Sequence, residues 1–265
     1  MTGSPQEGIR PIGYVEYRDG TAEEISGVVI EERSVCLFVN GREVAALLCS
    51  PGDLEDLAVG FAFSEGLVDA MSEIEEVSVS KGGTCVDLWL THEFDPPDRR
   101  VITSGCGGGV TFDDPATLAE RYPPMSGGPT VTPSQVSRLM EEVLRSAALY
   151  RAARGVHTSA LCDPDRPLLI AQDVGRHNTV DRLAGRALRT GFDPRGRILV
   201  TSGRVSSEMI AKAARLGAPL VISRTSPTTL SVELAAAWNL TVIGYARGTR
   251  FRVYAAPQRI DPGPG

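Results

Sequence analysis

The sequence lacks the signals of several large classes of protein. No apolar run approaches the roughly 18 residues that a membrane-spanning helix needs, and residues 1–10 are polar where a secretion signal would be apolar. Neither a Walker A sequence nor a Gly-x-Gly-x-x-Gly fingerprint occurs, which disfavours NTP hydrolysis and Rossmann-type NAD binding. We therefore expect a cytoplasmic protein without a membrane partner.

Cysteine and histidine are too few and too widely spaced to suggest a metal site. No Cys-x-x-Cys or His-x-x-x-His spacing occurs among the five cysteines and three histidines, so no structural zinc is expected. An odd number of cysteines in such a chain predicts reduced thiols. Cys36 and Cys85 lie within hydrophobic strands and are expected in the core, whereas Cys49 and Cys162 carry no sign of reactivity.

Lysine is almost absent, because Lys81 and Lys212 are the only two among 27 basic side chains. The formal net charge of −6 is unevenly distributed: residues 1–150 hold 10 basic and 25 acidic side chains, and residues 151–265 hold 17 and 8. Planar guanidinium groups suit anion binding better than ammonium groups do. The C-terminal half is therefore expected to bind an anion, and its few interleaved aromatic residues argue against nucleic acid.

The patterns that are present predict a mixed α/β chain. Two hairpins are expected in the N-terminal half, around Asn40-Gly41 and Gly82-Gly83, with a helix from about residue 50 to 65 between them. The stretch 123–133 is rich in Pro and Gly. It suggests a boundary between a smaller, mainly β (α+β) N-terminal domain, residues 1–125, and a C-terminal α/β domain, residues 126–265.

Strands and helices alternate in the C-terminal half. After one long helix over 132–153, strands are expected at 157–161, 168–172, 198–201, 220–222, 241–245 and 251–254. Helices are expected at 178–189, 206–216 and 228–238. This alternation predicts a mostly parallel sheet that is covered by helices.

Four of these strands lead into turns that contain arginine: Arg176, Arg204, Arg224, and Arg247 with Arg250. In such sheets, ligands bind beyond the carboxyl ends of the strands. Three of the turns open a helix, whose free N–H groups attract anions, and glycines such as Gly203 let the backbone approach a ligand. We expect a basic crevice for phosphate or pyrophosphate, with simply solvated loop arginines as the alternative.

Cys106 lies in the segment 103–109, where four glycines surround it. A cysteine used for packing would have larger neighbours, so we expect a thiol that reaches a partner protein; a tight turn with an incidental cysteine is the alternative.

His177 follows Asp173 by four residues and shares its turn with Arg176. It is either a ligand or proton-transfer group, or a satisfied structural residue. His157 is expected to be structural.

Together these segments resemble the FdhD family over nearly the whole chain. The resemblance rests on the order and spacing of Asp-Leu-Ala-Val-Gly-Phe at 56–61, Thr-Ser-Gly-Cys-Gly at 103–107, Asp-Val-Gly-Arg-His-Asn-Thr-Val-Asp at 173–181, Ser-Gly-Arg-Val-Ser at 202–206, and Gly-Tyr-Ala-Arg at 244–247 with Arg250. It implies a C-terminal three-layer α/β domain similar to the cytidine-deaminase fold, without its zinc chemistry.

The resemblance also implies a function. Such a protein is a sulfurtransferase, a homodimer whose cysteine, here Cys106, takes persulfide sulfur from an IscS-type cysteine desulfurase. The sulfur passes to the molybdenum (or tungsten) bis(molybdopterin guanine dinucleotide) cofactor, which is then inserted into formate dehydrogenase. The stretch expected to hold that cofactor consists of Tyr245, Ala246, Arg247, Gly248, Thr249 and Arg250. The arginine turns suit its phosphates and add Arg176, His177, Gly203, Arg204 and Arg224.

The chain departs from the family at one position. Some members carry a Cys-x-x-Cys pair, but the residue three after Cys106 is Gly109. One thiol must then both accept and deliver the sulfur, or the transfer step differs. Two other classes stay open: a cofactor-binding chaperone in which Cys106 is secondary, and a cysteine hydrolase built from Cys106, His177 and Asp173.

Overall fold

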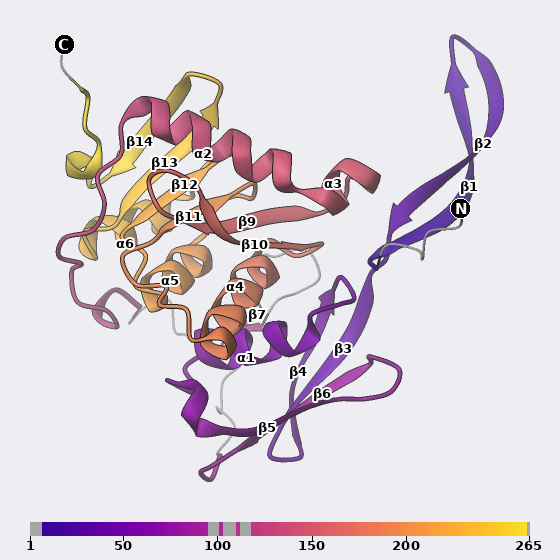
Figure 1. Cartoon of the computed structure of the whole chain (residues 1–265), viewed down its shortest axis with the longest axis horizontal. Coiled ribbons are helices and arrows are strands. Elements are labelled where there is room, and N and C mark those ends of the chain that lie inside the picture. Colours follow the sequence, from indigo (N-terminus) through magenta and orange to yellow (C-terminus); the bar gives the residue numbers. More distant parts are fainter. Residues whose placement is uncertain (1–6, 95–100, 103–109, 112–117, 264–265) are drawn as a thin grey trace.

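The centre of the C-terminal half is a six-stranded sheet (Figure 1). The computed structural model describes residues 7–94, 101–102, 110–111 and 118–263, so Cys106 and its glycines lie outside the described residues. The sheet order is β10-β9-β11-β12-β13-β14. The strands are β9 His157–Cys162, β10 Pro167–Asp173, β11 Ile198–Thr201, β12 Leu220–Ser223, β13 Thr241–Arg247 and β14 Arg250–Ala255.

The expectation of a mostly parallel sheet is wrong. Of the neighbouring pairs in this sheet, β11–β12 and β12–β13 are parallel, and the other three are antiparallel. The reason is the length of the connections. β9 leads into β10, and β13 into β14, through turns too short for the crossover that parallel neighbours require.

Helices cover both faces of this sheet, which gives three layers (Figure 1). α2 (Pro133–Ser146) lies across one face, and α4 (Arg176–Thr190), α5 (Ser207–Arg215) and α6 (Thr229–Ala237) cover the other. Successive residues of a strand point to opposite faces of the sheet. Val200 therefore belongs to the apolar cluster that contains residues of α2, and Leu199 to the cluster that contains residues of α5. The α/β class is confirmed, and the likeness to the cytidine-deaminase fold stays a prediction.

The helix expected over 132–153 is divided in two. α2 starts at a capping box, in which the Thr132 side chain accepts a hydrogen bond from the N–H of Gln135. Ala147 then leaves the helical region with a ψ of 81°, and α3 (Ala148–Ala153) follows. The backbone N–H of Leu149 donates a hydrogen bond to the side-chain oxygen of Gln172 in β10 at 3.0 Å. A strand residue thus accepts the hydrogen bond that a backbone carbonyl would accept in a continuous helix.

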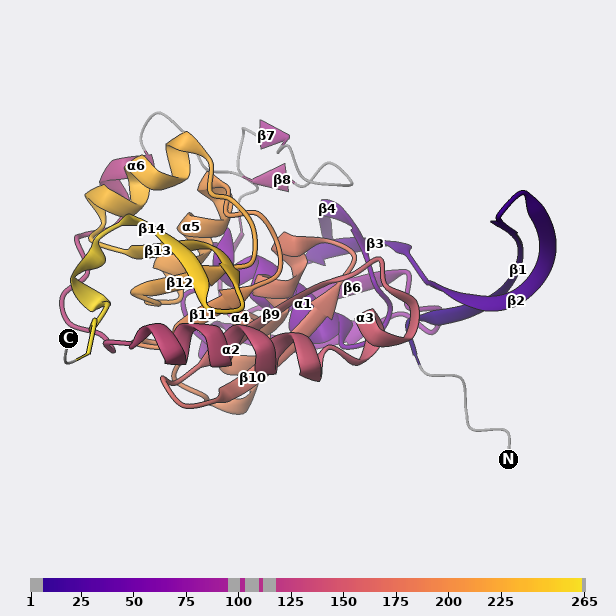
Figure 2. The ribbon, with the colours of Figure 1, turned by 90° about the horizontal axis from the view of Figure 1, so that it is seen from above.

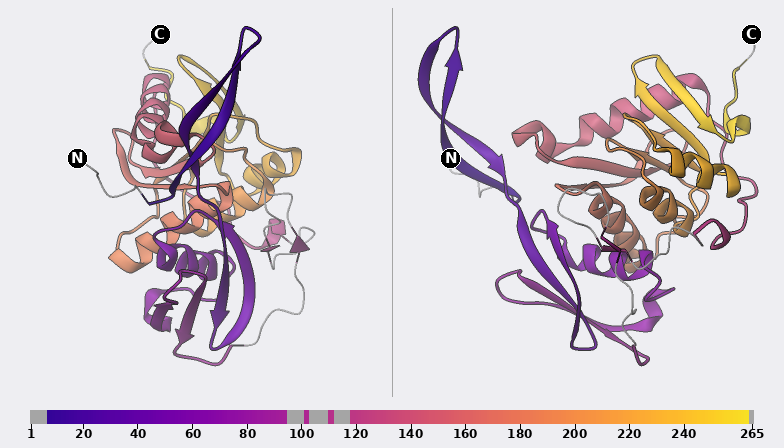
Figure 3. Two further views of the ribbon diagram at one scale, coloured as in Figure 1. Left: turned by 90° about the vertical axis from the view of Figure 1, so that its right-hand side faces the viewer. Right: turned by 180° about the vertical axis from the view of Figure 1, so that it is seen from behind.

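The N-terminal half contains a four-stranded sheet in the order β4-β3-β6-β5, with α1 (Leu54–Ser64) beside it (Figure 3). Both expected hairpins form: β3 (Arg33–Val39) pairs with β4 (Arg42–Cys49), and β5 (Ile74–Val79) with β6 (Cys85–Leu90). β7 (Val101–Ile102) pairs with β8 (Val110–Thr111). The 3₁₀ turns are Met71–Glu73, Leu118–Glu120 and Pro257–Arg259. No helix in the described part of the chain is long and apolar enough to cross a membrane.

Cys36 and Cys85 lie on the outer face of this sheet, so the expectation that both belong to the core is wrong. In β3 the core positions are taken by Val35 and Leu37, and in β6 by Val86. Because side chains alternate along a strand, both thiols point away from the core, and both are partly exposed.

A long hairpin that the sequence-based expectation did not include extends away from the rest of the protein (Figures 1 and 2). β1 (Ile9–Arg18) and β2 (Thr21–Ile30) pair antiparallel along their whole length. This pair is a two-stranded sheet of its own. Large apolar side chains are exposed along it: Ile12, Tyr14, Val15, Tyr17, Val28 and Val29.

Helices α1 and α4 cross in direct backbone contact, which joins the two halves of the chain. A Cβ atom at Gly60 would lie 1.7 Å from the carbonyl oxygen of Asp181, and one at Gly185 would lie 1.8 Å from that of Asp56. Side chains larger than hydrogen at either position would therefore separate the helices.

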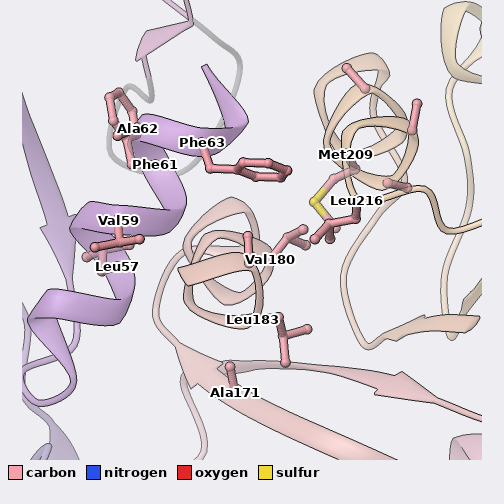
Figure 4. Close-up of a cluster of buried hydrophobic side chains, with 14 of the residues drawn as sticks. Leu57, Val59, Phe61, Ala62, Phe63, Ala171, Val180, Leu183, Met209 and Leu216 are labelled. Atoms are coloured by element: carbon pink, nitrogen blue, oxygen red, sulfur yellow. The ribbon is translucent and has the colours of Figure 1, made fainter. Parts of the chain in front are cut away.

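The same contact belongs to a continuous apolar core (Figure 4). The ring of Phe63 reaches from α1 toward Met209 and Leu216, and Val180 and Leu183 of α4 belong to the same cluster. The cluster contains residues from both sides of the proposed boundary at 125/126. That boundary stays a prediction.

Charged side chains around this contact pair the acidic half with the basic half. Asp56 of α1 accepts hydrogen bonds from Arg186 at 2.8 Å and Arg189 at 2.5 Å. Lys212 donates to Glu65 at 3.3 Å. Part of the charge asymmetry seen in the sequence is thus used inside the molecule and not presented to a ligand.

Candidate functional site

The carboxyl ends of β10, β11, β12 and β13 meet at one edge of the large sheet. β9 lies antiparallel between β10 and β11, so these four strands share one direction. The turns that contain Arg176, Arg204, Arg224 and Arg247 therefore converge, together with His157 at the start of β9.

Backbone hydrogen bonds hold these turns together. The N–H of Val205 donates to Ser226 at 3.1 Å, and the N–H of Thr228 donates back to Val205 at 3.0 Å. Tyr245 is attached in the same way, because its N–H donates to the carbonyl of Thr225 at 2.9 Å. These bonds link the turns after β11, β12 and β13 to one another at the edge of the sheet, so the turns are not independent loops.

A pocket of about 340 Å³ lies beside these linked turns. Its polar wall comes from the sheet edge and its apolar wall from the side of α2 and α3; the lining residues are Leu144, Tyr150, Val156, His157, Thr158, Ser202, Arg224, Thr225 and Arg247. Two of the arginines expected from the sequence, Arg224 and Arg247, are therefore brought to one cavity. Nε of Arg247 donates to the backbone carbonyl of Arg224 at 3.3 Å, which attaches the Arg247 side chain to the turn that contains Arg224.

The stretch 245–250 forms the end of β13 and the tight turn into β14. Tyr245 has a φ of 54°, in the left-handed region, and the guanidinium of Arg252 lies 4.5 Å from the centre of its ring. Ala246 is buried, whereas Arg247, Gly248, Thr249 and Arg250 are exposed. This segment presents arginine to solvent beside the pocket.

Arg176, His177 and Gly203 lie beneath the edge and do not line the pocket. Arg176 is 4% exposed, and a Cβ atom at Gly203 would lie 2.9 Å from the Cβ of Arg176. Nε2 of His177 lies 3.1 Å from Oγ of Ser206 and 3.3 Å from Oε2 of Glu208. Burial lowers the pKa of His177 well below its usual value, and Arg176 acts in the same direction.

The carboxylate of Asp173 forms its hydrogen bonds with groups other than His177. It accepts four hydrogen bonds, from the backbone of Ser50 at 3.1 Å and of Gly175 at 2.8 Å, and from Asn178 and Arg182 at 2.8 Å each. Ser50 precedes α1, so Asp173 joins the two halves of the chain. The pairing of His177 with Asp173 that the hydrolase alternative requires is therefore not formed.

Comparison with known proteins identifies the family. The FdhD/NarQ family model matches residues 30–261. This chain belongs to the FdhD/NarQ family. The chain is 35% identical over 251 residues to the sulfur carrier protein FdhD of Bacillus subtilis, across 92% of this chain and 94% of that protein. It is also 35% identical over 250 residues to the sulfur carrier protein FdhD of Staphylococcus aureus, across 93% and 94% of the two chains.

A solved structure supports the FdhD/NarQ assignment. The crystal structure of a formate dehydrogenase accessory protein from Desulfotalea psychrophila matches with a TM-score of 0.81 and 28% sequence identity. The match covers 96% of this chain and 100% of that one. The resemblance found in the sequence motifs is confirmed.

His157 is a pocket residue of this FdhD/NarQ chain that the sequence did not reveal. It was expected to be structural, yet it lines the cavity, with Nδ1 3.4 Å from Oγ of Ser202. Burial lowers the pKa of His157, and Arg176 and Arg204 lower it further, so the ring is neutral near pH 7. No cluster of potential metal ligands occurs among the residues that the structure describes.

Proposed function

We propose that this chain is a sulfurtransferase. It carries persulfide sulfur from a cysteine desulfurase to the molybdenum or tungsten bis(molybdopterin guanine dinucleotide) cofactor that formate dehydrogenase requires. Membership of the FdhD/NarQ family supports the sulfur-carrier role, since its curated relatives are named sulfur carrier proteins. The arginine-lined pocket supports a phosphorylated cargo.

The pocket suits one nucleotide part of that cargo. Arg224 and Arg247 provide guanidinium groups that can form paired hydrogen bonds with phosphate oxygens. Thr225 and Ser202 add hydroxyl groups, and neutral His157 adds a ring nitrogen. The apolar wall from Leu144 and Tyr150 gives a base or pterin ring a surface to lie on.

Calorimetric titration with guanosine diphosphate tests the pocket. Arg224→Ala and Arg247→Ala should each weaken binding by roughly 10- to 100-fold, because a hydrogen bond to a charged group contributes about 1.5–3 kcal/mol. Arg195→Ala is the matched control, since this exposed arginine precedes β11 at the opposite edge and pairs with Asp193. Unchanged affinity in both pocket variants would overturn the assignment of the pocket.

We assign the sulfur-carrying step to Cys106, which lies outside the described residues. Its thiolate attacks the outer sulfur of the desulfurase persulfide, a new S–S bond forms, and the desulfurase thiolate leaves. Mass spectrometry after incubation with a desulfurase and cysteine should show one additional sulfur atom on Cys106 and none in Cys106→Ala. Absence of that sulfur from Cys106 would contradict the proposal.

The same variant separates transfer from the alternative of a cofactor-binding chaperone, which the pocket alone would suit. If Cys106→Ala still binds guanosine diphosphate but no longer supports formate dehydrogenase activity, sulfur transfer is the function. If activity is retained, the chaperone role replaces it.

The proposal includes a homodimer, and the β1–β2 hairpin is the surface that supports it. A two-stranded hairpin is at best marginally stable alone in water, yet this one exposes apolar side chains such as Tyr14 and Val28. A second copy of the chain would cover them. Light scattering should give twice the chain mass of 28.2 kDa, and Ile12→Glu combined with Tyr14→Glu should give the monomer.

A further inference from the structure

Two thiols lie side by side on the outer face of the N-terminal sheet. β3 and β6 are parallel neighbours, and Cys36 is the direct partner of Cys85 in their register. Both cysteines are free and partly exposed, and the Cys85 thiol lies close enough to Cys36 to raise the pKa of that thiol. The fold thus places two sulfur atoms together that are far apart in the sequence.

The spacing of these strands suits a covalent bond between the two sulfur atoms. Neighbouring strands are about 4.8 Å apart, and the Cα atoms of disulfide-bonded cysteines are usually about 4.4–6.8 Å apart. Paired residues of parallel strands also point their side chains to the same face. The register of β3 and β6 therefore places the two Cα atoms within the range that a disulfide between Cys36 and Cys85 requires.

We propose that Cys36 and Cys85 form a dithiol site that reacts with low-molecular-weight disulfides and closes to a reversible disulfide between β3 and β6. The site is separate from the arginine pocket and does not depend on the proposed function.

The reaction has two steps. The Cys85 thiolate attacks a small disulfide, so an S–S bond forms on Cys85 and one small thiolate leaves. The Cys36 thiolate then attacks the sulfur of Cys85 and releases the second small thiolate. Two electrons pass from the protein thiols to the small disulfide, which leaves as two thiols after it takes up the two protons.

The surroundings of the two thiols set this order. Desolvation raises the pKa of Cys36, and the carboxylate of Glu43 and the neighbouring thiol of Cys85 raise it further. Cys36 is thus less often ionised than an ordinary thiol and attacks second. Cys85 lies next to the turn at Gly82-Gly83, where a reactant can approach, with its Sγ 3.9 Å from the Thr84 hydroxyl.

The other two cysteines that the structure describes serve as internal controls. Cys49 and Cys162 are each 0% exposed, and burial raises the pKa of Cys49 to about 12 and also raises that of Cys162. A small disulfide cannot reach either thiol in the folded chain. Reaction at these positions would report unfolding.

The test uses the full chain in a Cys106→Ala background, so that its result is independent of the sulfur-carrier proposal. After treatment with oxidised glutathione and alkylation of the remaining thiols, unreduced peptide mapping should show the Cys36 and Cys85 peptides linked, with Cys49 and Cys162 unmodified. The melting temperature of the oxidised protein should rise by about 5 °C or more, because the disulfide closes a loop of about 50 residues.

Single substitutions distinguish the steps. Cys36→Ser should stop the reaction at a mixed disulfide between glutathione and Cys85, with no rise in melting temperature. Two results would overturn the proposal: no linked peptide at a large excess of oxidised glutathione, or separate glutathione adducts on Cys36 and Cys85 in the chain that retains both thiols.

Discussion

His177 is a buried histidine whose environment makes stability depend on pH. Burial lowers its pKa well below 6.5, and the positive charges of Arg176 and Lys212 act in the same direction. The unfolded chain therefore takes up a proton near pH 6.5 that the folded chain does not take up. The free energy of unfolding should decrease as the pH falls below about 6.5, by at most about 1.4 kcal/mol per pH unit for one such group.

His177→Gln should reduce this dependence, because glutamine does not titrate. Urea unfolding between pH 7.5 and 5 measures the slope for each chain. His92→Gln is the control, since it removes an exposed histidine and leaves the buried one in place. If the wild-type chain and His177→Gln lose stability equally over this range, the assignment of the effect to His177 is wrong.

The residue types of the pocket were predictable, but the positions of single side chains were not. Arginine after each strand pointed to Arg224 and Arg247, and the structure brings both to one cavity. His157 was missed because its place depends on β9 being antiparallel to β11, which no local pattern in β9 reveals. The pairing of Asp173 with Ser50 was equally hidden, because it joins segments far apart in the chain.

At the scale of elements, the contact between α1 and α4 has a sharp requirement for glycine. In an exposed helix, replacement of glycine by alanine stabilises by about 1 kcal/mol. Gly60→Ala should instead destabilise by at least about 2–3 kcal/mol, because its Cβ atom would overlap the carbonyl of Asp181. Urea denaturation measures the difference.

The control for this prediction is Gly13→Ala, where a Cβ atom meets nothing within 4 Å. Its effect should stay within about 0.5 kcal/mol. Equal stability of Gly60→Ala and the wild-type chain would show that α1 and α4 can separate without cost.

Elements with strong local signals were predicted, and those decided by distant contacts were not. Asn40-Gly41 correctly predicted the β3–β4 hairpin. Asp19-Gly20 carries a comparable signal for the β1–β2 hairpin, which was missed because its strands lack a clear alternation between polar and apolar residues. The break at Ala147 could not be foreseen, since it depends on a hydrogen bond from Leu149 to a residue of β10.

At the scale of the whole molecule, the charge asymmetry has two uses. Some basic residues of the C-terminal half pair with acidic residues near α1, as Arg186 does with Asp53 and Asp56 and Arg215 does with Asp69. Others, such as Arg204 and Arg250, are exposed at the strand ends. The sequence showed the imbalance of charge, but only the arrangement of the two halves shows how it is divided.

The shared core predicts that the two halves unfold together. The two tryptophans report on one half each: Trp89 in β6 is 44% exposed, and Trp238 after α6 is fully buried, with Nε1 donating to Ala119 at 2.9 Å. In Trp89→Phe, fluorescence follows Trp238 alone, while far-ultraviolet circular dichroism follows both halves.

We expect the two urea transitions of Trp89→Phe to coincide, because α1 and α4 share one apolar cluster and one set of ion pairs. Trp238→Phe, in which fluorescence follows the exposed Trp89, should again give transitions that coincide with each other, at a lower urea concentration because a buried ring is reduced in size. Separate midpoints for fluorescence and circular dichroism in either variant would mean that the halves are independent folding units despite their common core.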